Sequence, residues 1–505
     1  MKFKLFVYLG FLILATLPVA VFAQSGSQQP ELFENAELQE DLNYFTAVFR
    51  SIHPKPYWYL PTEEFDTTLI QFRTELPDTA SVTEFYSSLL PFINKIGDEN
   101  TRVYFPAFVL ADYIQKEGAF FPFLIQIIDN EIFITENLLP GNAIPQGAKI
   151  SAINGIGATR ILKKMQQMIP NQKETLQQSE IIENFSLLLW TAFQFDAPYE
   201  LSIRLPQEGI IHTYNVEGVP AEKLGITLGV ENKTLTNDFG FSVDQNRNFA
   251  TVRITSYSSH PELKKFLGDA FSQIEKSGVD HVIVDIRNLK SDDFAFPDAV
   301  LQYVTTTPYR HYAAIEAKSS PMTKSFYRNN YAQQKKHDLK FVRDKKTVRK
   351  AYRMVLKGID YASVYYAPEV KKPFKGGQEF PGEFYLLVNE GTKNSATVLA
   401  AIVQDHKLGL VIGKETGSRA SRFRELYHFS LPNTGIECTV PHRYYLRPSS
   451  FDSGFGVLPD YTVDPDPTDI AQGKDSMIEF AAGLFKKREG FREKRAAYEK
   501  RINKK

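Results

Sequence analysis

The sequence predicts an α/β fold for the C-terminal half of a 505-residue chain, preceded by a helical domain and a smaller mixed module. From about residue 249 onward, short apolar runs alternate with stretches of helical periodicity, which is the pattern of successive βα units. Between about residues 35 and 106, apolar residues instead recur at helical spacing. A chain of this length is expected to form two or three domains rather than one core.

The N-terminal helical domain is predicted over residues 35–106. A capping box, Ser81-Val82-Thr83-Glu84, precedes a second apolar run. The apolar positions that share one helical face in the first run are Leu42, Phe45, Val48 and Phe49. Residues 107–220 then mix short strands, at about 124–128 and 131–135, with a glycine turn at 147–155 and a helix through 162–168. The polar stretch at residues 217–238 is expected to be a linker.

The α/β domain is predicted over residues 239–470. Its expected strands are 249–254, 281–286, 384–388 and 409–413, with helices at 261–276, 296–304 and 395–404 and a last strand, 437–440, closing the series. A basic, tyrosine-rich insertion at about 310–380, with Arg343 to Lys350, Tyr361, Tyr365 and Tyr366, interrupts this pattern. Such a charge run is typical of a solvated face, and a docking role is the alternative.

Both ends of the chain carry distinct signals. Lys2 and Lys4 precede an apolar run and a small-residue cleavage site at Ala23, so residues 1–23 are predicted to be a signal peptide. The protein is therefore expected to be exported, to the periplasm or the extracellular space; an uncleaved membrane anchor is the alternative. Residues 471–505 end in a basic helix or tail, for which a solvated helix is expected and contact with an anionic membrane surface is the alternative.

Composition excludes several classes of function. The formal net charge is zero, so nothing in the bulk electrostatics favours nucleic acid. Cys438 is the single cysteine, which excludes an intramolecular disulfide and a cysteine-based metal site, and its strand-like flanks predict a buried thiol. The nine histidines lack metal-ligand spacing, so neither a metal nor another cofactor is expected.

Several motifs resemble, in the same order, landmarks of the tail-specific (C-terminal processing) serine peptidases. They are Ile96-Gly97-Asp98-Glu99-Asn100-Thr101, the turn at 147–155, Val282-Ile283-Val284-Asp285-Ile286-Arg287, residues 389–397, residues 411–417 and Gly456-Val457-Leu458-Pro459-Asp460. The resemblance implies a ClpP/crotonase-like spiral peptidase domain with a helical N-terminal domain and a PDZ-like module. In that module it implies peptide binding near Gly147, Gly155, Phe121 and Phe123, with polypeptide segments or protein C-termini as partners.

The resemblance also implies that the catalytic positions are degenerate. Asn394 occupies the position of the family's nucleophilic serine, and an amide is neither nucleophilic nor readily ionised. The base is a histidine or a lysine in the family; those positions hold Asn100 and Arg419, and a guanidinium does not deprotonate at physiological pH. The glycine turn that holds the oxyanion is replaced by residues 288–293, which include Asn288, Ser291 and Asp292 and no glycine.

Ser395, one residue beyond Asn394, is the candidate for a substitute nucleophile. One residue along a starting helix turns a side chain by about 100°, so Ser395 is expected to point away and to cap free backbone N–H groups. The sequence thus favours an exported, catalytically inactive relative that binds polypeptide segments. An active serine endopeptidase using Ser395 is the first alternative, and an envelope assembly or lipid-associated factor is the second. The sequence does not predict the oligomeric state.

Overall fold

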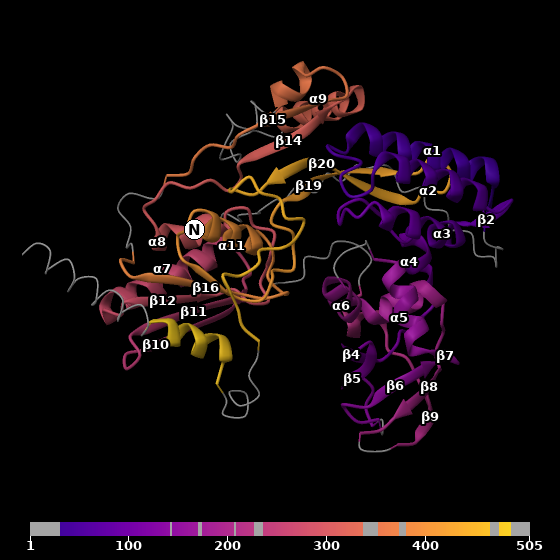
Figure 1. The fold of residues 1–505 in the computed structure, drawn as a ribbon. Helices are drawn as coiled ribbons and strands as arrows, with labels where there is room; N and C mark the ends of the chain where they lie inside the picture. Colours follow the sequence, from indigo (N-terminus) through magenta and orange to yellow (C-terminus); the bar gives the residue numbers. More distant parts are fainter. Residues whose placement is uncertain are drawn as a thin grey trace, which may run out of the picture.

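The computed structural model describes residues 31–141, 144–169, 174–206, 209–226, 236–336, 352–372, 380–464 and 474–485. The predicted signal peptide, the basic run from Arg343 to Lys350 and the C-terminal tail beyond residue 485 lie outside this part of the chain. Figure 1 shows an α/β domain, a group of N-terminal helices joined to it through a second sheet, and a separate lobe of strands and helices. The α/β class predicted from the sequence is confirmed.

The central sheet has six strands in the order β10-β11-β12-β16-β18-β21, of which β10 alone is antiparallel to its neighbour. The strands are β10 (Asp238–Asp244), β11 (Phe249–Ser256), β12 (His281–Asp285), β16 (Glu383–Val388), β18 (Leu410–Gly413) and β21 (Tyr461–Thr462). All five residues of β12 are buried. Burial on both faces is expected of a parallel strand, and it explains the continuous apolar runs in the sequence.

Helices cover one face of this sheet. They are α7 (His260–Ser277), α8 (Phe296–Val304) and α11 (Ser395–Asp405), and their apolar residues form one core with alternate strand residues. The helix α7 begins where Ser259 accepts a hydrogen bond from the Glu262 N–H, and it ends at Gly278, whose φ is 70°. On the other face, Met477, Ala481 and Phe485 of the helical residues 476–485 pack against Ile283.

The prediction that residues 437–440 close the central series is wrong. They lie in β20 (Glu437–Leu446), which belongs to a second, antiparallel sheet of order β15-β14-β20-β19, with β3 (Arg102–Val103) paired to the far end of β20. The other strands are β14 (Ala314–Ser319), β15 (Ala362–Tyr366) and β19 (Arg422–Ser430). The insertion therefore contributes ordered structure, β14, α9 (Pro321–Lys336) and β15; Tyr366 is buried, whereas Tyr361 and Tyr365 are exposed.

The N-terminal helices pack on the outer end of the β19–β20 hairpin (Figure 1). They are α1 (Asn35–Ile52), α2 (Thr62–Glu75) and α3 (Val82–Lys95), accompanied by the short strands β1 (Leu32–Glu34) and β2 (Thr79–Ser81). The capping box is confirmed, because the Ser81 N–H donates to Glu84 and the Glu84 N–H donates to Ser81 Oγ. Buried Asp41 of α1 accepts hydrogen bonds from the backbone N–H groups of Asn433 and Thr434. This carboxylate ties the hairpin turn to α1.

The separate lobe is a mixed module with a sheet of order β4-β5-β6-β8-β9 and β7 paired to β6. Its elements are β4 (Phe123–Ile128), β5 (Glu131–Asn137), β6 (Lys149–Ile153), β7 (Ile156–Gly157), α5 (Ala158–Gln167), α6 (Glu174–Phe193), β8 (Tyr199–Arg204) and β9 (Ile211–Val216), and α4 (Ala107–Gln115) precedes them. Gly147 and Gly155 have φ of 83° and 74°, which a residue with a side chain rarely adopts. Phe121 and Phe123 are fully buried in the module's core. Their predicted role as peptide contacts is therefore wrong, because apolar packing occupies both side chains.

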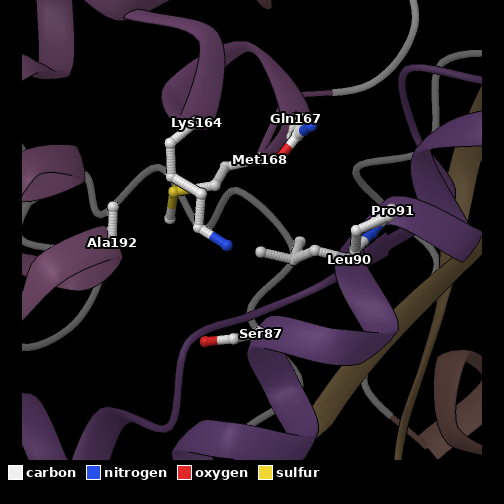
Figure 2. A pocket seen from close by; sticks show the side chains of 7 residues that line it. All are labelled: Ser87, Leu90, Pro91, Lys164, Gln167, Met168 and Ala192. Carbon is white, nitrogen blue, oxygen red and sulfur yellow. The ribbon is translucent and has the colours of Figure 1, made fainter. Parts of the chain in front are cut away.

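The mixed module meets the helical domain where α5 approaches α3. Figure 2 shows Lys164 of α5, and Met168 directly after that helix, facing Ser87 and Leu90 of α3, with Ala192 of α6 beside them. The cavity between them measures about 10 Å³, which is enough for roughly one water molecule. It is therefore a packing defect at the contact, too small for a ligand. Among the helices that the structure describes, none has the length and apolarity to cross a bilayer.

A partly buried acid on α8, Asp298, provides a test of the packing in the α/β domain. Asp298 accepts hydrogen bonds from Tyr309 and His311 and lies 3.5 Å from Lys371 Nζ. Burial raises its pKa, but His311, Lys371 and Tyr309 outweigh burial and hold the pKa at about 2, against an ordinary 3.8. A carboxylate whose pKa is lower in the folded than in the unfolded state stabilises the fold at pH values above its ordinary pKa. This stabilisation is lost as the pH falls towards the pKa of the folded state.

We therefore expect Asp298→Asn to lower the free energy of unfolding at neutral pH, and the difference from the unmodified protein to shrink between about pH 4 and pH 2. Urea denaturation across this range measures it. Asp112→Asn, in an exposed ion pair with Lys116, is the control and should show a much smaller change. A difference for Asp298→Asn that stays constant down to pH 2 would contradict the assignment.

Candidate functional site

Asn394, which the sequence predicts to occupy the nucleophile position, lies on a strained turn between β17 (Lys393–Asn394) and α11. Asn394 has φ 60° and ψ −119°, a conformation that costs a residue with a side chain about 1–3 kcal/mol. Two hydrogen bonds from neighbouring segments hold the turn. The Thr392 side-chain hydroxyl donates to the Ile286 carbonyl, and the Gly417 N–H donates to the Thr392 carbonyl. The strand β17 also pairs in parallel with β13 (Lys290–Ser291), which places Ser291 opposite Asn394.

The side chain of Asn394 is fully engaged by two charged partners. Its Nδ2 donates to Asp292 Oδ1 at 2.8 Å, and its Oδ1 accepts from Arg422 Nη2 at 2.9 Å. Its backbone N–H donates to Ser418 Oγ at 3.0 Å. The amide therefore acts as a polar bridge between an acid and a guanidinium, and it presents no ionisable or nucleophilic atom.

Strand β19 brings the Asp98–Thr101 segment to the same place. Asn100 Nδ2 donates to the Phe423 carbonyl at 2.8 Å, and Glu99 Oε1 lies 3.7 Å from Arg422 Nε. Asn100 and Asn394 are thus joined to consecutive residues of β19 although they lie far apart in the sequence. Asn100 is used structurally, and its amide cannot accept a proton from a nucleophile.

The two remaining candidates are also held in structural contacts. Arg419 Nη1 donates to the Gly97 carbonyl at 3.0 Å, and its guanidinium lies 4.0 Å from the centre of the Tyr59 ring. Ser395 is 1% exposed, and its Oγ has no hydrogen-bond partner. The predicted capping role of Ser395 is therefore wrong, since its hydroxyl accepts no backbone N–H. No base is hydrogen-bonded to it either.

The turn at residues 288–293, which the sequence predicts to replace the glycine turn, is built from side-chain hydrogen bonds. Asn288, with φ 62°, exchanges hydrogen bonds with Asn389 through its N–H and its Oδ1. Ser291 Oγ lies 2.5 Å from Tyr257 OH, and Asp293 accepts from His260 Nδ1 at 2.7 Å. Burial raises the pKa of Asp293, but the hydrogen bond and the charge of His260 lower the pKa by more than burial raises it. The pKa of Asp293 therefore lies below its ordinary value, which favours the ionised carboxylate. Acids fixed in this turn oppose an oxyanion there.

Sequence reasoning missed Arg422 and Arg424, two consecutive inward-facing positions of β19. Both are buried, at 6% and 8% exposure, and the Arg424 guanidinium lies 4.2 Å from the centre of the Phe294 ring. Burial lowers the pKa of Arg422; Glu99 opposes this shift, whereas Arg424 adds to it. The sequence signal was the alternation Arg422-Phe423-Arg424 within a strand, because arginine is seldom buried without a partner.

Within the described residues, no group of three or more histidine, cysteine or acidic side chains is arranged to hold a metal ion. A surface hollow of about 560 Å³ lies elsewhere, along the β10–β11 hairpin near Arg247 and Ile478. Neither Asn394 nor its partners line that hollow. The candidate site is therefore the cluster of Asn394, Asp292, Arg422, Arg424 and Glu99, called the remnant site below.

Comparisons with known proteins give a family match for part of the chain and a shared fold for most of it. Residues 307–463 match the model of Peptidase family S41. The fold is similar to that of CPAF in complex with lactacystin, with 13% identity, a TM-score of 0.62, and coverage of 89% of this chain and 98% of that chain. Another structure of mature CPAF gives 14% identity, a TM-score of 0.58, and coverage of 86% and 94%. The photosystem II D1 C-terminal processing protease also matches, at 16% identity and a TM-score of 0.42, with coverage of 86% and 95%.

A search of curated protein sequences finds no significant match. The family model and the shared fold together confirm the family that the sequence motifs resemble. The chain is a tail-specific-protease-like protein whose residues 307–463 belong to peptidase family S41.

Proposed function

We propose that this protein is an exported, catalytically inactive member of the tail-specific protease family that binds polypeptide segments. The observation that carries the proposal is the Asn394 amide, which occupies the strained turn of the nucleophile and is bonded to both Asp292 and Arg422. Loss of the nucleophile costs a serine protease about 10⁶-fold in rate, and loss of one oxyanion donor about 10²–10³-fold. Because the nucleophile, the base and the oxyanion turn are all changed, no step of acyl transfer has a residue that would catalyse it.

The active-peptidase alternative needs Ser395 to act as the nucleophile. A nucleophilic serine requires an adjacent base and an open path to the substrate. Ser395 has neither in this conformation, because its hydroxyl is buried and without a partner. The lipid-associated alternative rests on the two basic segments at residues 343–350 and 486–505, which the structure does not describe.

Polypeptide binding is proposed for the mixed module as well as for the remnant site. Among the described strands, β4 and β9 are the edges of its sheet, and β4 exposes the apolar side chains of Leu124 and Ile128 at 43% and 53%. An extended peptide adds to such an edge through backbone hydrogen bonds, while exposed side chains give selectivity. The turn at Gly147 and Gly155 supports a PDZ-like assignment for this module, with residues 107–220 as its proposed extent.

The test of inactivity is a fluorophosphonate probe together with casein as substrate. We expect no labelling and no hydrolysis, either in the purified protein or in Asn394→Ser, because a serine there would have Arg422 and Asp292 as neighbours and no base. An active member of the same family is the positive control. Labelling of the unmodified protein that disappears in Ser395→Ala would overturn the proposal and establish the peptidase alternative.

The binding half of the proposal has its own test. Isothermal titration of the purified full chain against unstructured peptides is expected to give dissociation constants below 1 mM, which corresponds to about −4 kcal/mol. If none of the peptides binds at millimolar concentration, the proposal of polypeptide binding is refuted, whatever the outcome of the labelling experiment.

A further inference from the structure

The remnant site contains hydrogen-bond donors that the protein itself does not satisfy. Arg422 uses Nη2 for Asn394, but its Nε and Nη1 are buried and have no hydrogen-bond partner; the same is true of Arg424 Nη1. Both guanidinium groups are more than nine-tenths buried and point to the same face of β19, two residues apart. A buried charged donor without a partner costs more than an ordinary lost hydrogen bond, so such groups are rare in native structures.

The neighbouring acids do not complete the site. Glu99 Oε1 lies 3.7 Å from Arg422 Nε without forming a hydrogen bond, and it also lacks a partner. Asp292 is engaged by Asn394, and Glu425 accepts from Arg443 and Tyr445. A small shift of Glu99 would satisfy Arg422 Nε, the one of the three unpaired nitrogens from which a distance to Glu99 is short. The Nη1 groups of Arg422 and Arg424 still need an acceptor.

The start of α11 adds a second source of positive potential. The helix has 11 residues, and Asn394 at its N-cap makes no side-chain capping hydrogen bond. Ser395 Oγ, in the first turn, is buried and also unpartnered. Free N–H groups at a helix N-terminus favour anions, and a guanidinium pairs with a carboxylate through two parallel hydrogen bonds.

We propose that the remnant site binds a carboxylate of a polypeptide through Arg422 and Arg424, with Asn394 positioning Arg422. This inference rests on the proposed polypeptide binding and specifies its chemistry: the carboxylate is either an acidic side chain or the chain's C-terminus. Phe294 is 52% exposed and its ring lies over the Arg424 guanidinium, so the solvent side of this guanidinium carries a side chain that a ligand would have to displace. The site of hydrolysis in active relatives would then be a site of charge recognition here.

Three peptides of one sequence test this inference on the full-length protein. They are acetyl-Gly-Phe-Glu-Ala-Ala-amide, the same peptide with Gln in place of Glu, and the Gln peptide with a free C-terminus. Isothermal titration is expected to show at least tenfold tighter binding for one or both carboxylate peptides than for the uncharged amide, which is about 1.4 kcal/mol. The Glu and free-terminus arms separate the two sources of the carboxylate.

Arg424→Gln is expected to abolish this preference, and Arg424→Lys, which keeps the charge but loses the planar fork, to retain part of it. Arg253→Gln, which removes the same charge from an exposed pair with Asp238, is the matched control and should leave the preference unchanged. Thermal unfolding confirms that each variant is folded; if Arg424→Gln is not, Arg424→Lys decides. Equal affinity for all three peptides, or an unchanged preference in the Arg424 variants, overturns the carboxylate site while polypeptide binding stands. If none of the three peptides binds with a dissociation constant below 1 mM, both the carboxylate site and polypeptide binding are refuted.

Discussion

Replacement of Arg447 by methionine is expected to lower the free energy of unfolding by about 3–5 kcal/mol, because it leaves a buried carboxylate without its partner. Arg447 forms two hydrogen bonds to Asp405, from Nε at 3.0 Å and from Nη2 at 2.6 Å, and the side chains are 8% and 5% exposed. The pair joins the C-terminal end of α11 to the segment after β20, so it also supports the helix that starts at the remnant site. Denaturant unfolding measures the loss.

The control for this prediction is Arg253→Met, in an exposed pair with Asp238 at 3.2 Å, for which a loss of at most about 1 kcal/mol is expected. The double variant Arg447→Met/Asp405→Leu should recover part of the stability, because it removes the unpaired charge. A loss for Arg447→Met no greater than that of the control would show that the buried pair contributes little.

The parallel strands of the central sheet were predictable from the sequence. Strand β12 is buried on both faces, so its three central residues, Val282, Ile283 and Val284, form an apolar run that no solvent-facing position breaks. The predicted helix 395–404 differs from α11 by one residue for a similar reason, since residues 395–403 are all buried and most of them are apolar. β10, in contrast, is an edge strand whose residues are mostly half-exposed, and it was missed although Phe239, Phe241 and Val243 alternate with polar residues and glycine.

The second sheet could not be predicted as a whole because, apart from the β19–β20 hairpin, its pairings join segments that are far apart in the sequence. β3 pairs with β20 through Arg102 and Thr439, which are separated by most of the chain, and no periodicity records which strand meets which. The segment 437–440 was correctly identified as a strand but assigned to the wrong sheet. Its partners, β14 and β19, decide the assignment, and neither had been predicted.

Part of the remnant site could be predicted from the sequence, and the rest could not because it depends on contacts between distant segments. Asn394, Asn100 and Asp292 were found through the family's motifs, and each of them lies at or beside the cluster. Arg422 and Arg424 were not found, because their burial depends on where β19 lies relative to the turn at Asn394. Phe121 and Phe123 show the converse error, since an apolar motif in a sequence does not distinguish a binding groove from a core.

Asn394→Ala is expected to lower the free energy of unfolding by about 2–4 kcal/mol, because it removes hydrogen bonds to two charged groups and leaves buried Arg422 with one more unsatisfied donor. Asn394→Gly loses the same bonds but relieves the backbone strain at φ 60°, which more than offsets the extra chain entropy of glycine.

Glycine at position 394 is therefore expected to be more stable than alanine by about 1 kcal/mol. The matched comparison is Gln273 in the exposed part of α7, where glycine should instead be less stable than alanine by about 1 kcal/mol. Urea denaturation of the four variants decides between the two orders. Glycine less stable than alanine at both positions would mean that the turn at Asn394 is relaxed in solution. The opposite order at the two positions would mean that the protein retains the strained backbone of a nucleophile turn and uses it to hold an amide between Asp292 and Arg422.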